Sequence, residues 1–99
     1  MCWRQLLAVT ILAGLLGCRS RPSAEEARRF LEAAEARLLE LSNRQAMAQW
    51  VQATYITPDT EALAARTQQE TIAATMDLAK QATRFDGLAL PEDVARRLK

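Results

Sequence analysis

Histidine is absent from this chain of 99 residues, cysteine occurs only twice and glycine three times. Zinc hydrolysis needs imidazole or thiolate ligands in a fixed arrangement, usually with a glutamate as general base. The lack of histidine excludes a His-Glu-x-x-His site, and it also excludes Ser-His-Asp and Cys-His catalysis. No glycine-rich phosphate-binding loop is present. We therefore predict no catalytic residue and no metal ligand within these residues.

An excess of charge is also missing. The 13 lysines and arginines nearly balance the 12 acidic residues, and the net charge is +1. Binding of nucleic acid needs a basic surface, so we expect no nucleic-acid partner. Proline is as scarce as glycine, whereas alanine, leucine, glutamate, arginine and glutamine dominate. This composition favours helix and predicts an all-α fold.

A stretch without charge follows the first basic residue. Arg4 precedes residues 6–17, which carry no charge, and Arg19 and Arg21 follow. A basic start before a short apolar run is typical of a secretory signal peptide. The run is shorter than the roughly 20 residues that a membrane-spanning helix needs. We predict a signal peptide over residues 1–17, either removed or lipid-modified, rather than a permanent transmembrane helix.

The end of this segment predicts a lipid anchor. Leu15-Leu16-Gly17-Cys18 resembles the bacterial lipoprotein signal, although Leu16 is larger than the usual residue at its position. Lipidation of Cys18, with residues 18–22 as a tether, would hold the protein on the bacterial cell envelope, facing the periplasm or exterior. Stable anchoring takes more than one acyl chain. The alternative is an ordinary cleaved signal and a secreted protein, in which Cys18 is incidental.

A long helix is predicted after the tether. Ser23 and Glu26 have the spacing of a capping box, and no proline or glycine follows until Pro58. We expect a helix over about residues 24–53. Two ion pairs with the favourable spacing of four residues are expected along it, Glu25 with Arg29 and Glu40 with Arg44.

The apolar residues of this helix change side along its length. A stripe in the first half consists of Ala27, Phe30, Leu31, Ala34, Leu38 and Leu41. Met47 and Trp50 project to the opposite face, together with Leu39. One partner helix cannot cover both faces, which indicates part of a larger helical body.

A second helix is predicted from Pro58 to about Arg84. Thr57 can cap it, and the short link of residues 54–57 predicts an antiparallel hairpin. Its expected apolar stripe is weak and consists of Ala65, Gln69, Ile72, Met76, Ala79 and Thr83. Gly87 is the expected stop. A third helix is expected from Pro91 to Lys99, and its lack of a stop signal predicts that residues 23–99 are the N-terminal helical part of an incomplete domain.

Few side chains remain as candidates for function. The carboxylate pairs Glu25/Glu26 and Glu92/Asp93 fall at helix starts, where capping and the helix dipole explain them. Trp50 and Tyr55 can line a cleft, but a core or interface role is favoured for aromatic residues near a helix end.

Four short segments resemble one family when they are taken in order. These are Glu26-Ala27-Arg28-Arg29-Phe30-Leu31, Ala48-Gln49-Trp50, Thr54-Tyr55-Ile56-Thr57 and Ala82-Thr83-Arg84-Phe85. Their order and spacing resemble the opening of the angiotensin-converting-enzyme family of peptidyl-dipeptidases (peptidase M2). The resemblance covers most of residues 23–99, and its weight lies in spacing rather than in a single motif.

The resemblance implies an all-α, two-lobed zinc enzyme that removes dipeptides from peptide C-termini. In that family two histidines and a glutamate hold zinc, a second glutamate is the base, and many members respond to chloride. The first two helices belong to a lid over the cleft, so residues 23–84 would limit substrate access. No zinc ligand or catalytic residue carries over to this chain, and peptide substrates would bind through a part that it lacks.

Two other interpretations stay open. The chain can be a small envelope lipoprotein, in which a helical hairpin acts as an adaptor or scaffold and oligomerises to bury its second face. It can also be a degenerate paralogue that keeps the lid helices without catalysis.

Overall fold

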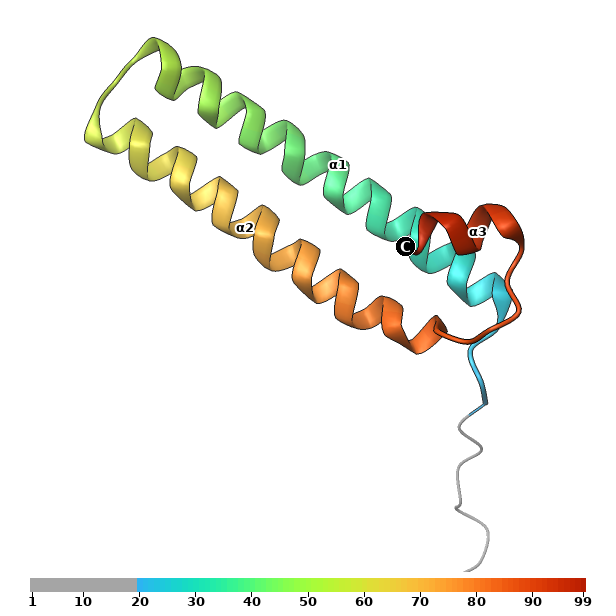
Figure 1. Ribbon diagram of the computed structural model, residues 1–99. Helices are drawn as coiled ribbons and strands as arrows, with labels where there is room; N and C mark the ends of the chain where they lie inside the picture. Colours follow the sequence, from blue (N-terminus) through green and yellow to red (C-terminus); the bar gives the residue numbers. More distant parts are fainter. Residues whose placement is uncertain (1–19) are drawn as a thin grey trace, which may run out of the picture.

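The computed structural model describes residues 20–99, so the predicted signal peptide over residues 1–17 and Cys18 lie outside the described part. Two long helices, α1 (Ala24–Thr54) and α2 (Pro58–Ala82), form an antiparallel hairpin (Figure 1). A 3-10 turn, η1 (Thr83–Phe85), follows α2, and the short helix α3 (Glu92–Arg97) folds back onto α1. This arrangement confirms the predicted all-α fold, with a hairpin and the start of a third helix.

The predicted cap of α1 is present. The Ser23 hydroxyl accepts a hydrogen bond of 3.1 Å from the Glu26 amide, and the Glu26 carboxylate accepts one of 3.3 Å from the Ser23 amide. These two bonds satisfy amide groups that the first helical turn leaves without partners. At the other end, the Thr54 hydroxyl lies 3.0 Å from two carbonyl oxygens of the last turn, so the helix ends with these acceptors satisfied.

A pair of threonines closes the link between the two long helices. Thr57 caps α2 as predicted, and its hydroxyl accepts a hydrogen bond of 3.2 Å from the Thr60 amide. The Thr60 hydroxyl accepts in return from the Thr57 amide at 3.0 Å and also contacts the Tyr55 carbonyl. Local side chains therefore satisfy much of the backbone at this turn, and the helices reverse direction within three residues.

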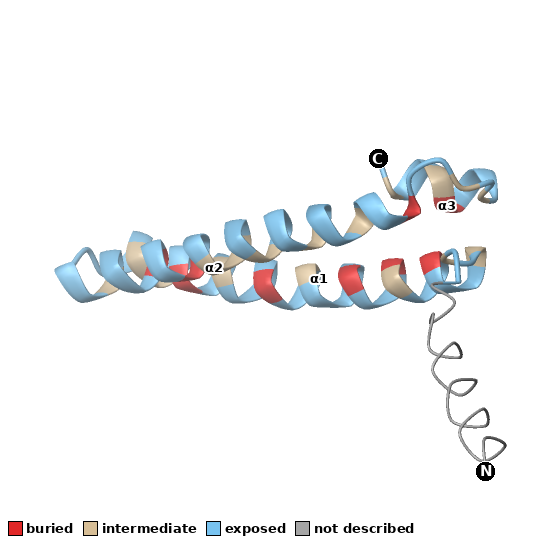
Figure 2. Cartoon of the chain, turned by 90° about the horizontal axis from the view of Figure 1, so that it is seen from below, coloured by how far each residue is buried: buried red, intermediate tan, exposed pale blue. Residues whose placement is uncertain are grey.

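The first apolar stripe of α1 faces inward, toward α2 and, at the open end of the hairpin, toward η1 and α3. Ala27, Leu31, Ala34 and Leu41 are buried, and Phe30 and Leu38 are half-buried. The stripe continues past the point where the apolar pattern changes side, because Gln45 is half-buried and Ala48 is buried. Figure 2 shows these buried positions on the side of α1 that faces the other helices. Gln45 and Ala48 thus continue the helix contact into the second half of α1.

The predicted apolar stripe of α2 is wrong, since all six of its residues are exposed. The helix instead turns mostly small residues toward α1. The inward set is Ala64, Thr67, Thr71, Ala74 and Leu78. The hydroxyl of Thr67 donates to the carbonyls of Leu63 and Ala64, at 3.2 and 3.0 Å, and Thr71 donates to the Thr67 carbonyl at 2.9 Å. Because these hydroxyls are satisfied within the helix, threonines can line a helix contact at little cost.

A second small core lies at the open end of the hairpin. Ala27, Leu31, Phe85 and Val94 are each at most 5% exposed and pack together. Gly87, which follows α2 and η1, has a φ of +74°, so it is the stop that the sequence predicted. Helix α3 was expected to extend from Pro91 to Lys99, but it covers only Glu92–Arg97. This shorter helix brings Val94 over the base of α1.

Candidate functional site

The described residues contain no constellation for metal chemistry. In residues 20–99 no three His, Cys, Asp or Glu side chains gather where they could hold a metal ion. The side chains of the hairpin and α3 therefore do not fit the zinc that the resemblance implies, and we derive no chemical step for them. No helix in the same range is long and apolar enough to cross a membrane.

The acidic pairs at the helix starts have local roles. Glu26 completes the cap of α1, and the carboxylate of Glu25 lies 3.2 Å from Arg29, which is the ion pair expected from the sequence. Glu92 and Asp93 occupy the first turn of α3. All four carboxylates lie near the positive end of a helix dipole, where negative charge is favourable.

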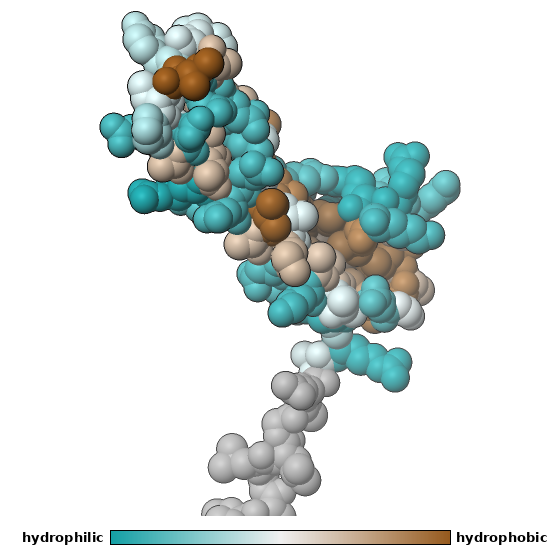
Figure 3. All heavy atoms as spheres, turned by 60° about the vertical axis from the view of Figure 1, so that its left-hand side comes forward, coloured by the Kyte–Doolittle hydropathy of each residue, from teal (hydrophilic) through white to brown (hydrophobic). Residues whose placement is uncertain are grey.

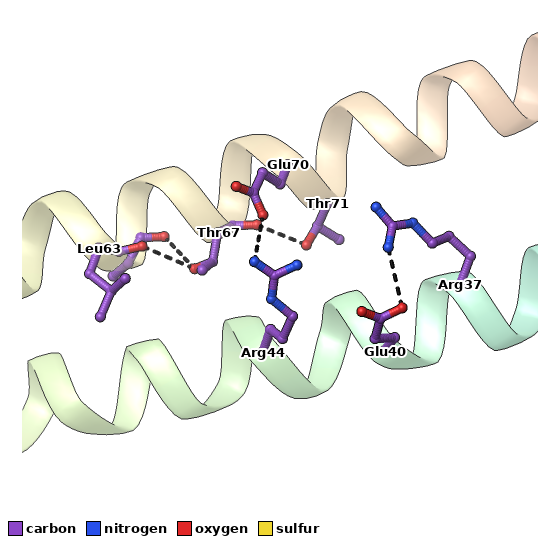
Figure 4. A network of polar contacts seen from close by, with 8 residues as sticks. Arg37, Glu40, Arg44, Leu63, Thr67, Glu70 and Thr71 are labelled. Carbon is purple, nitrogen blue, oxygen red and sulfur yellow. Dashed lines mark hydrogen bonds and ion pairs between the residues drawn. The ribbon is translucent and has the colours of Figure 1, made fainter.

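The prediction of a second ion pair, between Glu40 and Arg44, is wrong. Glu40 does not pair with Arg44 but with Arg37, at 3.2 Å, and Arg44 instead reaches Glu70 on α2, also at 3.2 Å (Figure 4). The pair between Arg44 and Glu70 crosses the hairpin, beside the threonines of α2. Glu70 on the facing helix thus pairs with Arg44 in place of Glu40, which lies one turn away on α1. The spacing along one helix does not reveal a partner on the other helix.

A cluster of charged and aromatic side chains joins the elements at the base. Arg97 donates two hydrogen bonds to the Glu35 carboxylate. These hydrogen bonds lower the pKa of Glu35, an effect that desolvation opposes in part, and they raise the pKa of Arg97. The guanidinium of Arg84 lies over the rings of Phe30 and Phe85, at 5.4 and 4.6 Å from their centroids. These contacts orient α3 and the end of α2 on α1, a structural role that the sequence did not reveal.

The outer face of α1 carries large apolar residues that nothing in the described chain covers. Leu39 and Met47 are both 62% exposed, and Trp50 is 69% exposed. This exposure agrees with the predicted second apolar face of α1, although Met47 also borders a groove between the long helices. We call these three residues the outer row. Large exposed apolar residues of this kind commonly mark a surface that contacts another part of a protein or a partner.

The hairpin tip continues this exposed surface. Tyr55 is 72% exposed and Ile56 79%. The sequence favoured a core or interface role for Tyr55 and Trp50, and their exposure leaves the interface role. No charged residue occurs between Gln45 and Pro58. Beside the tip, an open groove of about 250 Å³ lies between the long helices and is lined by Arg44, Met47, Ala48, Val51, Leu63 and Thr67. Figure 3 shows hydrophobic patches near this end among hydrophilic atoms.

One comparison with known proteins found a match. A family model described as angiotensin-converting enzyme, peptidase M2, matches residues 21–99. The matched range begins two residues before the cap of α1 and includes all three α-helices. Neither the search of curated proteins nor that of solved structures found a match.

Proposed function

This chain belongs to the angiotensin-converting enzyme family of peptidases, and from that membership we propose that it contributes cleft-covering helices to an exported zinc peptidyl-dipeptidase. The catalytic residues would lie in another part of the polypeptide. Zinc would bind there, because residues 20–99 hold no metal-binding group. We place chloride and the peptide substrates in the same part, as the family resemblance implies. The chain alone would be inactive.

The observation that best supports a role within a larger peptidase is the exposed outer row. Leu39, Met47 and Trp50 expose large apolar side chains on α1, and Met47 also borders the groove between the long helices. In an isolated hairpin these exposed side chains would add nothing to the stability of the fold. If another part of the peptidase packs there, burial of these side chains would stabilise the assembled enzyme, by at most about 1.5–3 kcal/mol for a leucine or a methionine.

Export and anchoring are also part of the proposal. We infer that residues 1–17 are a signal peptide and that Cys18 is lipidated, which would place the enzyme on a bacterial envelope facing the periplasm or exterior. The support lies in Leu15-Leu16-Gly17-Cys18 and in the uncharged run before it. Labelling with a radioactive or clickable fatty acid would test this, and a Cys18→Ser chain that still takes up label would disprove it.

Sequencing of the gene beyond the codon for Lys99 tests the peptidase proposal. We expect an open frame that encodes a His-Glu-x-x-His helix and a downstream glutamate. Purified full-length product would then release dipeptides from a peptide C-terminus and lose this activity with a chelator. A stop codon directly after Lys99 in a confirmed genome would refute the proposal.

A helical adaptor of the envelope is the second candidate. It is favoured by the hairpin's own stabilising features, which are a capping box on each long helix and a small core at the base. Cooperative unfolding of the isolated chain, followed by circular dichroism, would support this candidate. A chain without stable helix would count against it, because helices without tertiary packing are marginal in water.

A further inference from the structure

One exposed face of α2 has a pattern that is complementary to itself. It contains Asp59, Ala62, Leu63 and Arg66, which have the i, i+3, i+4, i+7 spacing of one helix face. All four residues are exposed, and Leu63 is 45% exposed although it is a large apolar residue. We call these four residues the α2 face. It lies on α2, and its Leu63 borders the same groove as Met47 of the outer row.

The two charges of this face have no partner within the described residues. Neither Asp59 nor Arg66 takes part in an ion pair among residues 20–99. They are seven residues apart, which at 1.5 Å per residue is about 10 Å along the helix and too far for a direct contact. Each therefore presents a charge that another surface can satisfy.

From this arrangement we propose that two copies of the chain pair through the α2 face, with their α2 helices antiparallel about a two-fold axis. The midpoint between Asp59 and Arg66 falls between Ala62 and Leu63. An antiparallel pairing centred there places Asp59 of each copy opposite Arg66 of the other, so that two equivalent ion pairs form. A lipid surface offers no such reciprocal match, and this is why we choose a second copy as the occupant.

The centre of the face suits a close contact between helices. Ala62 is small and allows the two helix axes to approach, while Leu63 supplies the apolar contact. The groove beside Leu63, which Met47 and Val51 also line, extends the apolar surface next to the axis. Ala64 and Thr67 are buried against α1 on the neighbouring side of this helix. The pairing does not involve them, so it would leave the hairpin intact.

Sedimentation equilibrium of the full 99-residue chain, in a density-matched nonionic detergent, tests the pairing. We expect a reversible dimer that weakens as salt is raised, because exposed ion pairs are screened. Leu63→Glu should abolish the dimer. The matched control is Ile72→Glu, since Ile72 is 51% exposed and lies nine residues further along α2, on the opposite side of the helix. A monomer at every concentration, or a dimer that survives Leu63→Glu, would overturn the inference.

Exchange of the two charges gives the sharper test. Asp59→Arg or Arg66→Asp alone should raise the dimer dissociation constant about tenfold, because each creates two like-charge contacts. The double variant Asp59→Arg, Arg66→Asp should restore the original constant. Circular dichroism checks that each variant keeps its helices. A double variant as weak as the singles would refute the two-fold pairing, whereas the proposed peptidase function would stand in either case.

Discussion

Arg97 donates two hydrogen bonds to Glu35, of 2.8 and 2.6 Å, across 62 positions of the sequence. This bidentate contact joins α3 to the first half of α1, while Val94 fills the core at the base of the hairpin. Both side chains are partly exposed, so the pair orients α3 more than it stabilises the fold. The contact nevertheless makes the docking of α3 sensitive to pH.

We predict that α3 loosens in acid. Its hydrogen bonds with Arg97 lower the pKa of Glu35 from an ordinary value of 4.5. The stability from this pair is therefore fully present above pH 4.5 and is lost as the pH falls through the lowered pKa of Glu35. Hydrogen exchange at the Leu98 amide, which donates to the Val94 carbonyl, would follow the loss. Glu35→Gln should remove this pH dependence, and an unchanged acid transition in that variant would contradict the prediction.

A matched pair of leucines tests the hairpin interface. Leu41 is 2% exposed and Leu39 is 62% exposed, although they lie two residues apart on α1. We expect Leu41→Ala to lower the free energy of unfolding by about 2–5 kcal/mol, because it leaves a cavity against α2. Leu39→Ala should change it by less than about 0.5 kcal/mol. Urea unfolding followed by circular dichroism measures both values, and equal effects would show that the chain buries another face of α1.

Removal of the cap of α1 should lower the free energy of unfolding by less than Leu41→Ala does. Ser23→Ala removes the hydroxyl that accepts from the Glu26 amide, and it should cost about 1 kcal/mol of unfolding free energy. Ser20→Ala is the control, since Ser20 is exposed and precedes the helix. Thermal unfolding should show a lower midpoint for the first variant alone. The cap would not contribute to stability if both variants unfolded with the midpoint of the parent chain.

Substitutions of Gly87 test its role in ending the helical segment after α2 and η1. Its φ of +74° lies in the left-handed region, which side chains with a Cβ rarely adopt. A Cβ added there meets no atom within 4 Å, so Gly87→Ala should destabilise through backbone strain alone, by about 1 kcal/mol. Gly87→Asn should cost less, because asparagine tolerates this conformation better. Denaturant unfolding can rank the three chains, and an alanine variant as stable as the parent would contradict the assigned strain.

Local patterns in the sequence predicted much of this fold. The bounds of α1 and the start of α2 follow from Ser23, Thr57 and Pro58, which act on the nearest helical turn. The outer row was likewise predicted, because Met47 and Trp50 sit out of phase with the first stripe of α1. For the candidate site, the sequence revealed the apolar surface of α1 but not the exposed face of α2.

The sequence by itself determined where helices begin and turn, because caps and turns involve groups within a few residues of each other. Tertiary structure alone decided which side of α2 is buried and which partners Arg44 and Arg97 take. Hydrophobicity ranks Ile72 and Met76 above Thr67 and Thr71, yet the threonines face α1. Their hydroxyls are satisfied within the helix and their small size allows close packing. Such choices depend on the shape and charge of the facing helix, which no local pattern contains.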